Sequence, residues 1–226
     1  MKEYTDILNK CLLFSEINPE DIPAMLTCLN ASVVKAKKDT FVFHEGEGAK
    51  YVGIVLKGNI QIVKDDFFGN RSIVATLGAG EIFGETFACA EINEMPVSAV
   101  TSEDSEIMLV DCRRIMVTCG NSCEFHNKMI HNLLKVLALK NLEFNHKIEI
   151  ISKRTTRDKL MTYLMGQAKK NNSQNFVIPF DRQELADYLG VERSALSAEM
   201  SRMRKDGIIE YTKNRFRLLS ESQRSD

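Results

Sequence analysis

A helical pattern runs through residues 121–152, a stretch unusually long for one helix of a globular protein. Apolar side chains recur there at alternating steps of four and three, the spacing of a coiled-coil seam. The seam consists of Ile130, Leu134, Leu137, Asn141, Phe144, Ile148 and Ile151. We therefore expect a dimerisation helix, in which Asn141 at an a position sets the register of two chains. The alternative is one core helix of a monomer.

The segment before this helix has the character of a β-structure. Short runs rich in Val, Ile and Phe, such as "YVGIVL", "IQIVK", "SIVATL" and "EIMLV", are separated by turn sequences that contain glycine. They predict an antiparallel barrel over about residues 33–110, preceded by short helices. A second apolar stripe on the long helix is expected to pack against this barrel; it consists of Phe125, Met129, Leu133 and Val136.

The apolar pattern breaks at residues 152–155, where a new helix begins. We expect a barrel domain over residues 1–120, the dimerisation helix over 121–152 and a C-terminal domain over 153–226. The net charge of the whole chain is -1, but residues 152–226 hold 15 Lys and Arg against 10 Asp and Glu. A basic C-terminal third favours a partner that carries phosphates.

Residues 181–211 have the pattern of a helix-turn-helix. Leu185, Ala186 and Leu189 form the inner face of a first helix, and Gly190 permits the turn. Leu196, Met200 and Met203 anchor a second helix, which is expected to enter the major groove of DNA. The basic run that follows predicts a two-stranded wing. Candidate DNA contacts are Arg182, Gln183, Arg193, Ser194, Ser197, Arg202, Lys213 and Arg215.

Arg193 is the candidate reader of guanine, because a guanidinium can donate two hydrogen bonds to O6 and N7. Arg182 and Gln183 suit phosphate contacts, which position the helix without reading sequence. The alternative is a winged helix used for protein contacts, with a solvated charged face.

The order of barrel, long helix and winged helix resembles the cyclic-AMP receptor protein and FNR (CRP/FNR) family of bacterial transcription regulators. The resemblance rests on "RQELADYLGVERSALS" and on "GAGEIFGE" with "SAVT" downstream. It implies an α+β fold with two domains, in which the barrel is a double-stranded β-helix of the jelly-roll type. It also implies a homodimer on a palindromic operator in double-stranded DNA, and for an activator a contact with RNA polymerase. Ser194 and Ala198 stand where the family often carries glutamate and arginine, so the operator is expected to differ.

The resemblance places an effector pocket between the barrel and the long helix. Its candidate residues are Phe83, Gly84, Glu85, Thr86, Val97, Ser98, Leu142 and Glu143. In members that bind cyclic AMP, an Arg-Ser pair grips the phosphate, whereas this chain has Val97 and Ser98. Because the charged anchor is missing, we expect an effector other than cyclic AMP.

Haem is an alternative effector of the same fold. Phe83, Phe87, Met95 and Val97 would give an apolar lining, and His131 or His146 would be the axial ligand. Cys119 and Cys123, one helical turn apart, are a candidate redox-sensitive thiol pair. Only Cys11 and Cys28 lie near the N-terminus, so the clustered cysteines of the iron-sulfur sensors are missing.

A cupin-type metalloenzyme is the alternative of a different class. Such a site needs two or three histidines and a carboxylate, and the barrel segment holds only His44. The chain has neither a signal-peptide pattern nor a run of 18 apolar residues, so we expect a cytoplasmic protein that does not enter a membrane.

Overall fold

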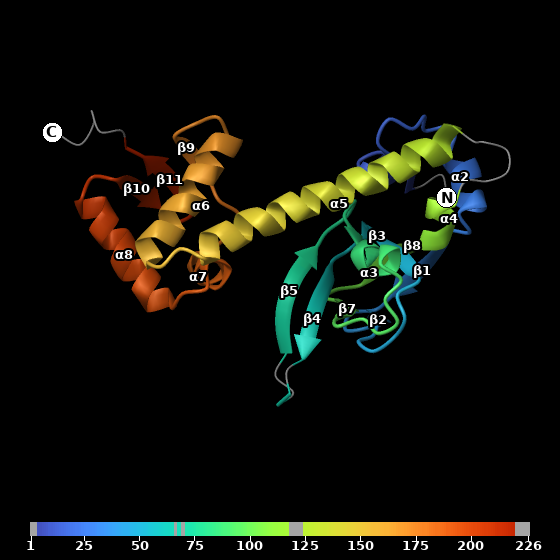
Figure 1. Cartoon of the computed structure of the whole chain (residues 1–226), viewed down its shortest axis with the longest axis horizontal. Coiled ribbons are helices and arrows are strands. Elements are labelled where there is room, and N and C mark those ends of the chain that lie inside the picture. The colour runs from blue at the N-terminus through green and yellow to red at the C-terminus, as the bar shows by residue number, and fades with distance from the viewer. Residues whose placement is uncertain (1–3, 66, 69–70, 118–123, 220–226) are drawn as a thin grey trace. The chain divides into compact units, whose positions relative to one another are not determined.

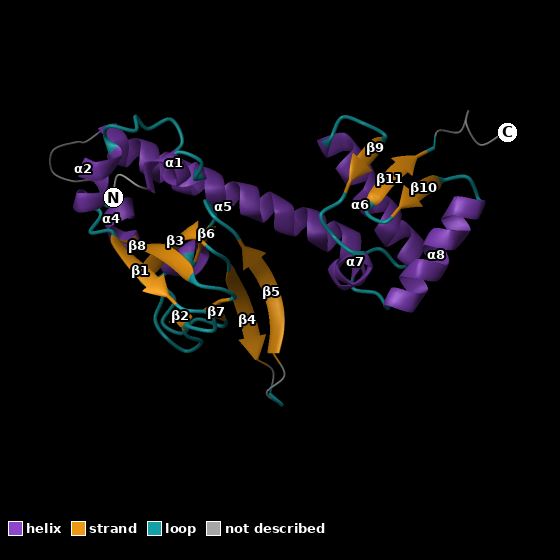
Figure 2. Ribbon diagram, turned by 180° about the vertical axis from the view of Figure 1, so that it is seen from behind, coloured by secondary structure: helices purple, strands orange, loops and turns teal. Residues whose placement is uncertain are grey.

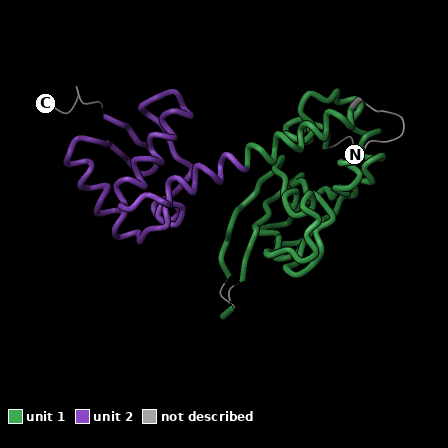
Figure 3. The backbone as a smooth tube through the Cα atoms, in the orientation of Figure 1, with its two compact units in different colours: residues 1–140 green, residues 141–226 purple. Residues whose placement is uncertain are grey.

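The computed structural model describes residues 4–65, 67–68, 71–117 and 124–219 (Figure 1). The chain divides into two compact units, residues 1–140 and residues 141–226 (Figure 3). The division falls inside α5, a helix of 28 residues that runs from Glu124 to Ile151. The long helix expected from the heptad pattern is therefore present, and residues 121–123 of that expectation lie outside the described part.

The first unit is built on two antiparallel four-stranded sheets within its described residues (Figure 2). One sheet has the order β1-β8-β3-β6 and the other the order β2-β7-β4-β5. The strands are β1 (Ser32–Ala36), β2 (Phe41–Phe43), β3 (Tyr51–Lys57), β4 (Ile60–Asp65), β5 (Arg71–Leu77), β6 (Ile82–Phe83), β7 (Ser98–Thr101) and β8 (Ser105–Asp111). The expected barrel is confirmed, and the four runs quoted above correspond to β3, β4, β5 and β8.

Side chains from both sheets meet in one buried cluster. Val55 of β3 and Ile107 of β8 come from one sheet, and Ile60 of β4 and Ala99 of β7 come from the other. Phe83 joins them, and its ring lies where a side chain at position 53 would be, which leaves room only for Gly53. Alternating strand positions therefore fill the space between the sheets, as a barrel of this kind requires.

Short helices and the first half of α5 cover the outside of the barrel. The helices are α1 (Thr5–Leu8), the 3₁₀ helix η2 (Leu12–Phe14), α2 (Ile22–Cys28), α3 (Glu85–Cys89) and α4 (Cys112–Met116). Met129, Leu133 and Val136 of α5 are buried in the same core as the helices, and Phe125 packs against it. The prediction that this stripe packs the long helix onto its own barrel is confirmed.

The second unit contains the end of α5, three further helices and a small sheet. These elements are α6 (Thr156–Lys170), β9 (Asn175–Val177), α7 (Arg182–Leu189), α8 (Arg193–Lys205), β10 (Ile209–Thr212) and β11 (Arg215–Leu218). Strands β10 and β11 form the expected wing, and β9 pairs with β11 as a third strand that was not predicted. A three-residue strand carries too few alternating positions to be distinguished from a loop. No helix of the described residues is both long and apolar enough to cross a membrane.

Candidate DNA interface and effector pocket

Local sequence fixes the start of α7. The Asp181 side chain accepts a hydrogen bond from the backbone N–H of Glu184, and the Glu184 carboxylate accepts one from the Asp181 backbone. This capping box satisfies two N–H groups that the first turn of a helix leaves free. Gly190 ends the helix in the left-handed conformation, at a φ of 61°, and α8 starts three residues later.

The helix-turn-helix has the predicted inner face. The six apolar side chains assigned to it have no exposed surface, and they are Leu185, Ala186, Leu189, Leu196, Met200 and Met203. They share one core with α6, the wing and Ile150 at the end of α5. Because both helices are fixed by buried contacts, α8 presents its opposite face as a rigid surface.

That opposite face begins with a cation. Arg193 and Ser194 are exposed in the first turn of α8, and Ser197 one turn later is half-buried. No ion pair engages Arg193 among the residues that the structure describes. Its guanidinium therefore keeps its five donors for an external acceptor.

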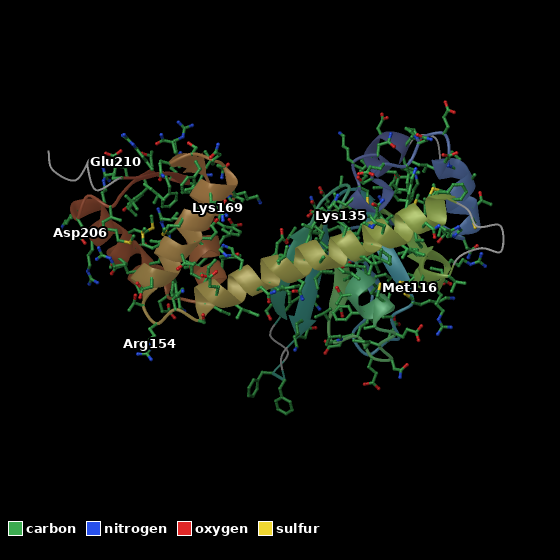
Figure 4. The ribbon with its side chains drawn as sticks, turned by 45° about the horizontal axis from the view of Figure 1, so that its top comes forward. Met116, Lys135, Arg154, Lys169, Asp206 and Glu210 are labelled. Atoms are coloured by element: carbon green, nitrogen blue, oxygen red, sulfur yellow. The ribbon has the colours of Figure 1, made fainter. Side chains whose placement is uncertain are left out.

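Arg202 lies further along α8 and differs from Arg193. Its guanidinium nitrogen is 3.0 Å from Oε2 of Glu199. The other carboxylate oxygen of Glu199, Oε1, is 3.6 Å from a guanidinium nitrogen of Arg157 in α6. Arg157 also pairs at 2.8 Å with Asp206. Asp206 lies at the C-terminal end of α8 and is labelled in Figure 4. Arg202 thus belongs to a charge network that fastens α8 to α6, and part of its charge is already balanced.

Arg182 is folded back into the unit. Its side chain contacts the Met200 sulfur and stacks over the Tyr211 ring, 5.2 Å from the centroid. Burial lowers the pKa of the guanidinium. Gln183 is exposed and donates to Asp187 at 2.8 Å. Of these two candidate phosphate contacts, the structure leaves Gln183 on the surface and uses Arg182 for packing.

The wing carries exposed cations at its turn. Lys213 and Arg215 are exposed, and Lys213 has a φ of 54°, a conformation that costs an L residue energy. Asn214 fastens the turn through its side-chain amide, which donates to the Ile178 carbonyl at 3.1 Å. Arg217 of β11 pairs with Glu210 of β10 at 3.5 Å. In the described part of the chain no ion pair engages Lys213 or Arg215, so the unpaired cations of the wing lie at its turn.

Four candidate effector residues of the barrel, Phe83 to Thr86, lie at the start of α3. Gly84 precedes this helix with a φ of 77°, and a Cβ there would lie 2.8 Å from the Phe43 ring and 3.0 Å from the Tyr51 carbonyl. Phe83 is buried and Thr86 is exposed. The backbone at residues 83–86 is therefore held in one conformation by close packing.

Glu85 is the central polar group of this region. It is 2% exposed, and its Oε1 accepts hydrogen bonds from Lys140 at 2.7 Å and from Thr86 at 3.1 Å. Lys140 also donates to the Ile82 carbonyl at 3.0 Å. The second oxygen, Oε2, is buried and has no hydrogen-bond partner among the described residues. A buried carboxylate oxygen with an open lone pair can accept from a ligand.

Lys140 was not predicted as part of the site. It lies 55 residues from Glu85 in the sequence, so no local pattern links them. Val97 is half-buried, and the hydroxyl of Ser98 accepts from the Glu45 backbone N–H at 2.9 Å. Position 97 holds valine and supplies no positive charge, whereas Lys140 places a cation beside Glu85.

Leu142 and Glu143 belong to the second unit. Both side chains are exposed. The burial of Tyr188 in α7, together with the charge of Glu143, raises the pKa of the Tyr188 hydroxyl. Within this unit, Lys147 also lies over the Tyr188 ring, 4.9 Å from its centroid. The last turns of α5 therefore pack on the DNA-binding unit, with Glu143 near α7.

The histidines of α5 have three different environments. His131 is exposed, while His146 is half-exposed, lies 3.6 Å from Glu149 and packs against Gly166 of α6. His126, which was not singled out from the sequence, is buried, and its Nε2 lies 3.9 Å from the Cys28 sulfur. Groups of three or more metal ligands are absent from the described residues. Cys119 and Cys123 lie outside them.

The seam side of α5 is largely exposed in the single chain. Leu134 is 61% exposed, Phe144 61% and Ile148 58%. Asn141 and Ile151 are also exposed, whereas Ile130 and Leu137 are half-buried, and Leu137 packs against the barrel core.

Around the junction after α5, the side chain of Arg154 projects away from the ribbon (Figure 4).

Known proteins match both units. Residues 33–117 match the cyclic nucleotide-binding domain family, and residues 158–223 match the Crp-like helix-turn-helix domain family. The cyclic AMP receptor protein of Thermus thermophilus is 24% identical over 204 residues, which are 87% of this chain and 87% of that relative.

Solved structures share the fold. The catabolite activator protein of Thermus thermophilus superposes with a TM-score of 0.54 and 21% identity, and the match covers 94% of this chain and 96% of that one. The global regulator CLP of Xanthomonas campestris superposes with a TM-score of 0.61 and 18% identity, over 90% of this chain and 100% of that one.

A barrel joined to a winged helix-turn-helix with an outward arginine defines a DNA-binding regulator. The chain belongs to the CRP/FNR family of transcription regulators, with a cyclic nucleotide-binding domain and a Crp-like helix-turn-helix. It is a regulator and not a metalloenzyme, and it binds DNA through its second unit.

Proposed function

We propose that the chain acts as a homodimer that binds a palindromic operator and that an effector in the barrel controls this binding. The observation that carries the proposal is Arg193, which no ion pair engages among the described residues, on the exposed face of α8, a helix fixed by buried contacts. In a symmetric dimer, two such helices enter successive major grooves about 34 Å apart. The domain boundaries that we propose remain those of the barrel (1–120), the long helix (121–152) and the DNA-binding domain (153–226).

The seam on α5 supports dimerisation. Leu134, Phe144 and Ile148 are large apolar side chains, and a single chain leaves most of their surface in water. Burying such a side chain contributes about 1.5–3 kcal/mol, so several of them in a row provide a substantial driving force. Asn141 hydrogen-bonds Asn145 on the same helix at 2.9 Å, and in a dimer it would fix the register at some cost in stability.

The dimer is tested with a matched pair of substitutions on α5. Ile148→Glu places a charge in the seam, whereas Leu139→Glu places one at an f position that faces away from it; Leu139 is 41% exposed. Sedimentation velocity should show a dimer for the wild type and for Leu139→Glu and a monomer for Ile148→Glu. A dimer of unchanged affinity in Ile148→Glu would show that the interface lies elsewhere.

Direct readout is assigned to Arg193, with Ser194 and Ser197 beside it. Arg182, Gln183 and Arg202 are proposed to position α8 on the operator, the first and third mainly by holding the unit together. Lys213 and Arg215 at the tip of the wing are proposed to contact phosphates, which add affinity without specificity.

The readout is tested on an operator selected from a random DNA library. Arg193→Ala should lose about 1–3 kcal/mol of discrimination at one base pair of each half-site. Lys213→Ala is the control, and it should weaken binding to all sequences equally and reduce the salt dependence by about one ion per half-site. An unchanged sequence preference in Arg193→Ala would remove that residue from the readout.

The effector is proposed to bind beside Glu85 and to be a molecule other than cyclic AMP. The buried Oε2 of Glu85 calls for a hydroxyl or N–H donor on the ligand, and Val97 supplies no charge for a phosphate. Similar proteins carry the names of different effectors, cyclic AMP in one case and c-di-GMP in another. Phe83, Gly84, Thr86, Ser98, Leu142 and Glu143 are the other candidate residues.

Haem remains the second candidate effector, because Phe83, Phe87, Met95 and Val97 would give it an apolar lining. An absorbance spectrum of protein purified from cells supplied with iron and haem precursor, together with native mass spectrometry, separates the candidates. A Soret band with one haem per chain would favour haem and lead to His131 and His146 as ligands to mutate. A colourless protein that retains a small organic mass would support the pocket at Glu85.

A further inference from the structure

Two cysteines from separate parts of the barrel unit meet at the ends of two helices. Cys89 is the last residue of α3, Cys112 is the first of α4, and their sulfur atoms are 3.5 Å apart. A disulfide bond is about 2.05 Å long, so closure needs an approach of about 1.5 Å. Cys11 and Cys28 have no such sulfur partner among the described residues.

The two thiols differ in access to solvent. Cys89 is half-buried, whereas Cys112 is only 1% exposed. A dissolved oxidant therefore reaches Cys89 first, and Cys112 can attack only from inside the protein.

The two thiols also differ in acidity. The hydrogen bond from the Cys112 thiol lowers the pKa of Cys89, although burial and the Glu85 charge oppose this effect. The same hydrogen bond, together with burial, raises the pKa of Cys112. The thiolate is the reactive form of cysteine, so the accessible member of the pair is also the more reactive one.

Cys112 is held in place by its surroundings. Its backbone N–H donates to the Lys50 carbonyl at 3.1 Å, and the Asp111 side chain caps α4 by accepting from the Arg113 backbone at 3.0 Å. Cys89 lies at the end of a five-residue helix, where less backbone has to move. The approach of the sulfurs is therefore mainly a shift of the end of α3.

We propose that Cys89 and Cys112 form a reversible oxidation site that closes to an intramolecular disulfide when the protein meets a peroxide. In the first step the Cys89 thiol and hydrogen peroxide give a sulfenic acid and water. In the second step the Cys112 sulfur attacks the Cys89 sulfur, the hydroxyl leaves, and the Cys112 proton joins it to form a second water. Two electrons pass from the two thiols to one peroxide, and a dithiol reductant reverses the reaction.

The disulfide has a structural consequence inside the same unit. Helix α3 begins at Glu85, and Glu85 is bound to Lys140 of α5. A bond at Cys89 therefore restrains the helix that carries the buried carboxylate. The oxidation site does not depend on which effector the pocket binds.

Peptide mapping of the full-length protein tests the proposal. No Lys or Arg lies between residues 72 and 112, so trypsin alone leaves both cysteines on one peptide. Digestion with glutamyl endopeptidase followed by trypsin separates "TFACAE", residues 86–91, from "IMLVDCR", residues 107–113. The reduced protein is treated with one equivalent of hydrogen peroxide and its remaining thiols are alkylated before digestion.

We expect these two peptides to appear linked, two hydrogens lighter than their sum, and to separate after treatment with dithiothreitol. In Cys112→Ser the linked species should be lost and Cys89 should carry a sulfenic acid that dimedone traps, while Cys28→Ser should behave as the wild type. Cys89 and Cys112 that both stay alkylatable, or a linkage of Cys89 to another cysteine in the wild type, would overturn the proposal. The wild-type map decides the question even where a variant folds poorly.

Discussion

Replacing Gly84 by alanine should destabilise the barrel unit by about 2–5 kcal/mol. About 1–2 kcal/mol comes from the backbone, because Gly84 has a φ of 77° and an L residue is strained there. The rest comes from the new Cβ, which would lie 2.8 Å from the Phe43 ring and 3.0 Å from the Tyr51 carbonyl oxygen. Overpacking of this kind costs about 1–3 kcal/mol, and the backbone oxygen has little freedom to move away.

Gly46→Ala is the matched control for Gly84→Ala. Gly46 lies in the same unit with a φ of 85°, but a Cβ there would have no atom within 4 Å. It should therefore show only the backbone cost, about 1–2 kcal/mol. Urea unfolding followed by far-UV circular dichroism gives both free energies of unfolding. Equal losses in the two variants would mean that the barrel relaxes around the Cβ and that close packing does not fix residues 83–86.

Two further predictions concern single contacts. Lys213→Gly should raise the free energy of unfolding by up to about 1 kcal/mol, because glycine adopts the positive φ of this position without strain. Lys213→Ala should not raise it, since alanine is strained there as lysine is. Both variants should lose the same DNA affinity. A stability gain in both variants would contradict this account. Lys140→Met should destabilise the barrel by about 1–3 kcal/mol because it leaves the buried Glu85 carboxylate without its cation, and Glu85→Gln in the same chain should recover most of the loss. Additive losses in that double-mutant cycle, measured by urea unfolding, would show that the two side chains are not coupled.

The helix-turn-helix was predictable residue by residue. Its capping box spans four residues, its turn needs one glycine, and its buried side chains repeat at the spacing of one helix face. The same holds for α5, where two stripes of different register indicated that Met129 faces the barrel and Phe144 faces away. Each of these features lies within a few turns of chain, so the geometry of the helix alone relates the residues to one another.

Pairings between distant segments were not predictable. Lys140 meets Glu85, Cys89 meets Cys112 and Arg182 packs on Tyr211 only because separate elements come together in the folded units. The short strands β6 and β9 likewise exist through their partners and not through their own few residues.

The sequence by itself determined the longer helices and strands and their order, since these depend on periodicity and local turn chemistry. The family was indicated by the resemblance of its motifs. Tertiary structure alone decided which polar groups are buried together, which arginines have no ion pair among the described residues and which thiols lie side by side. Those outcomes depend on sheet register and helix packing, where a shift of one residue changes every neighbour of a side chain.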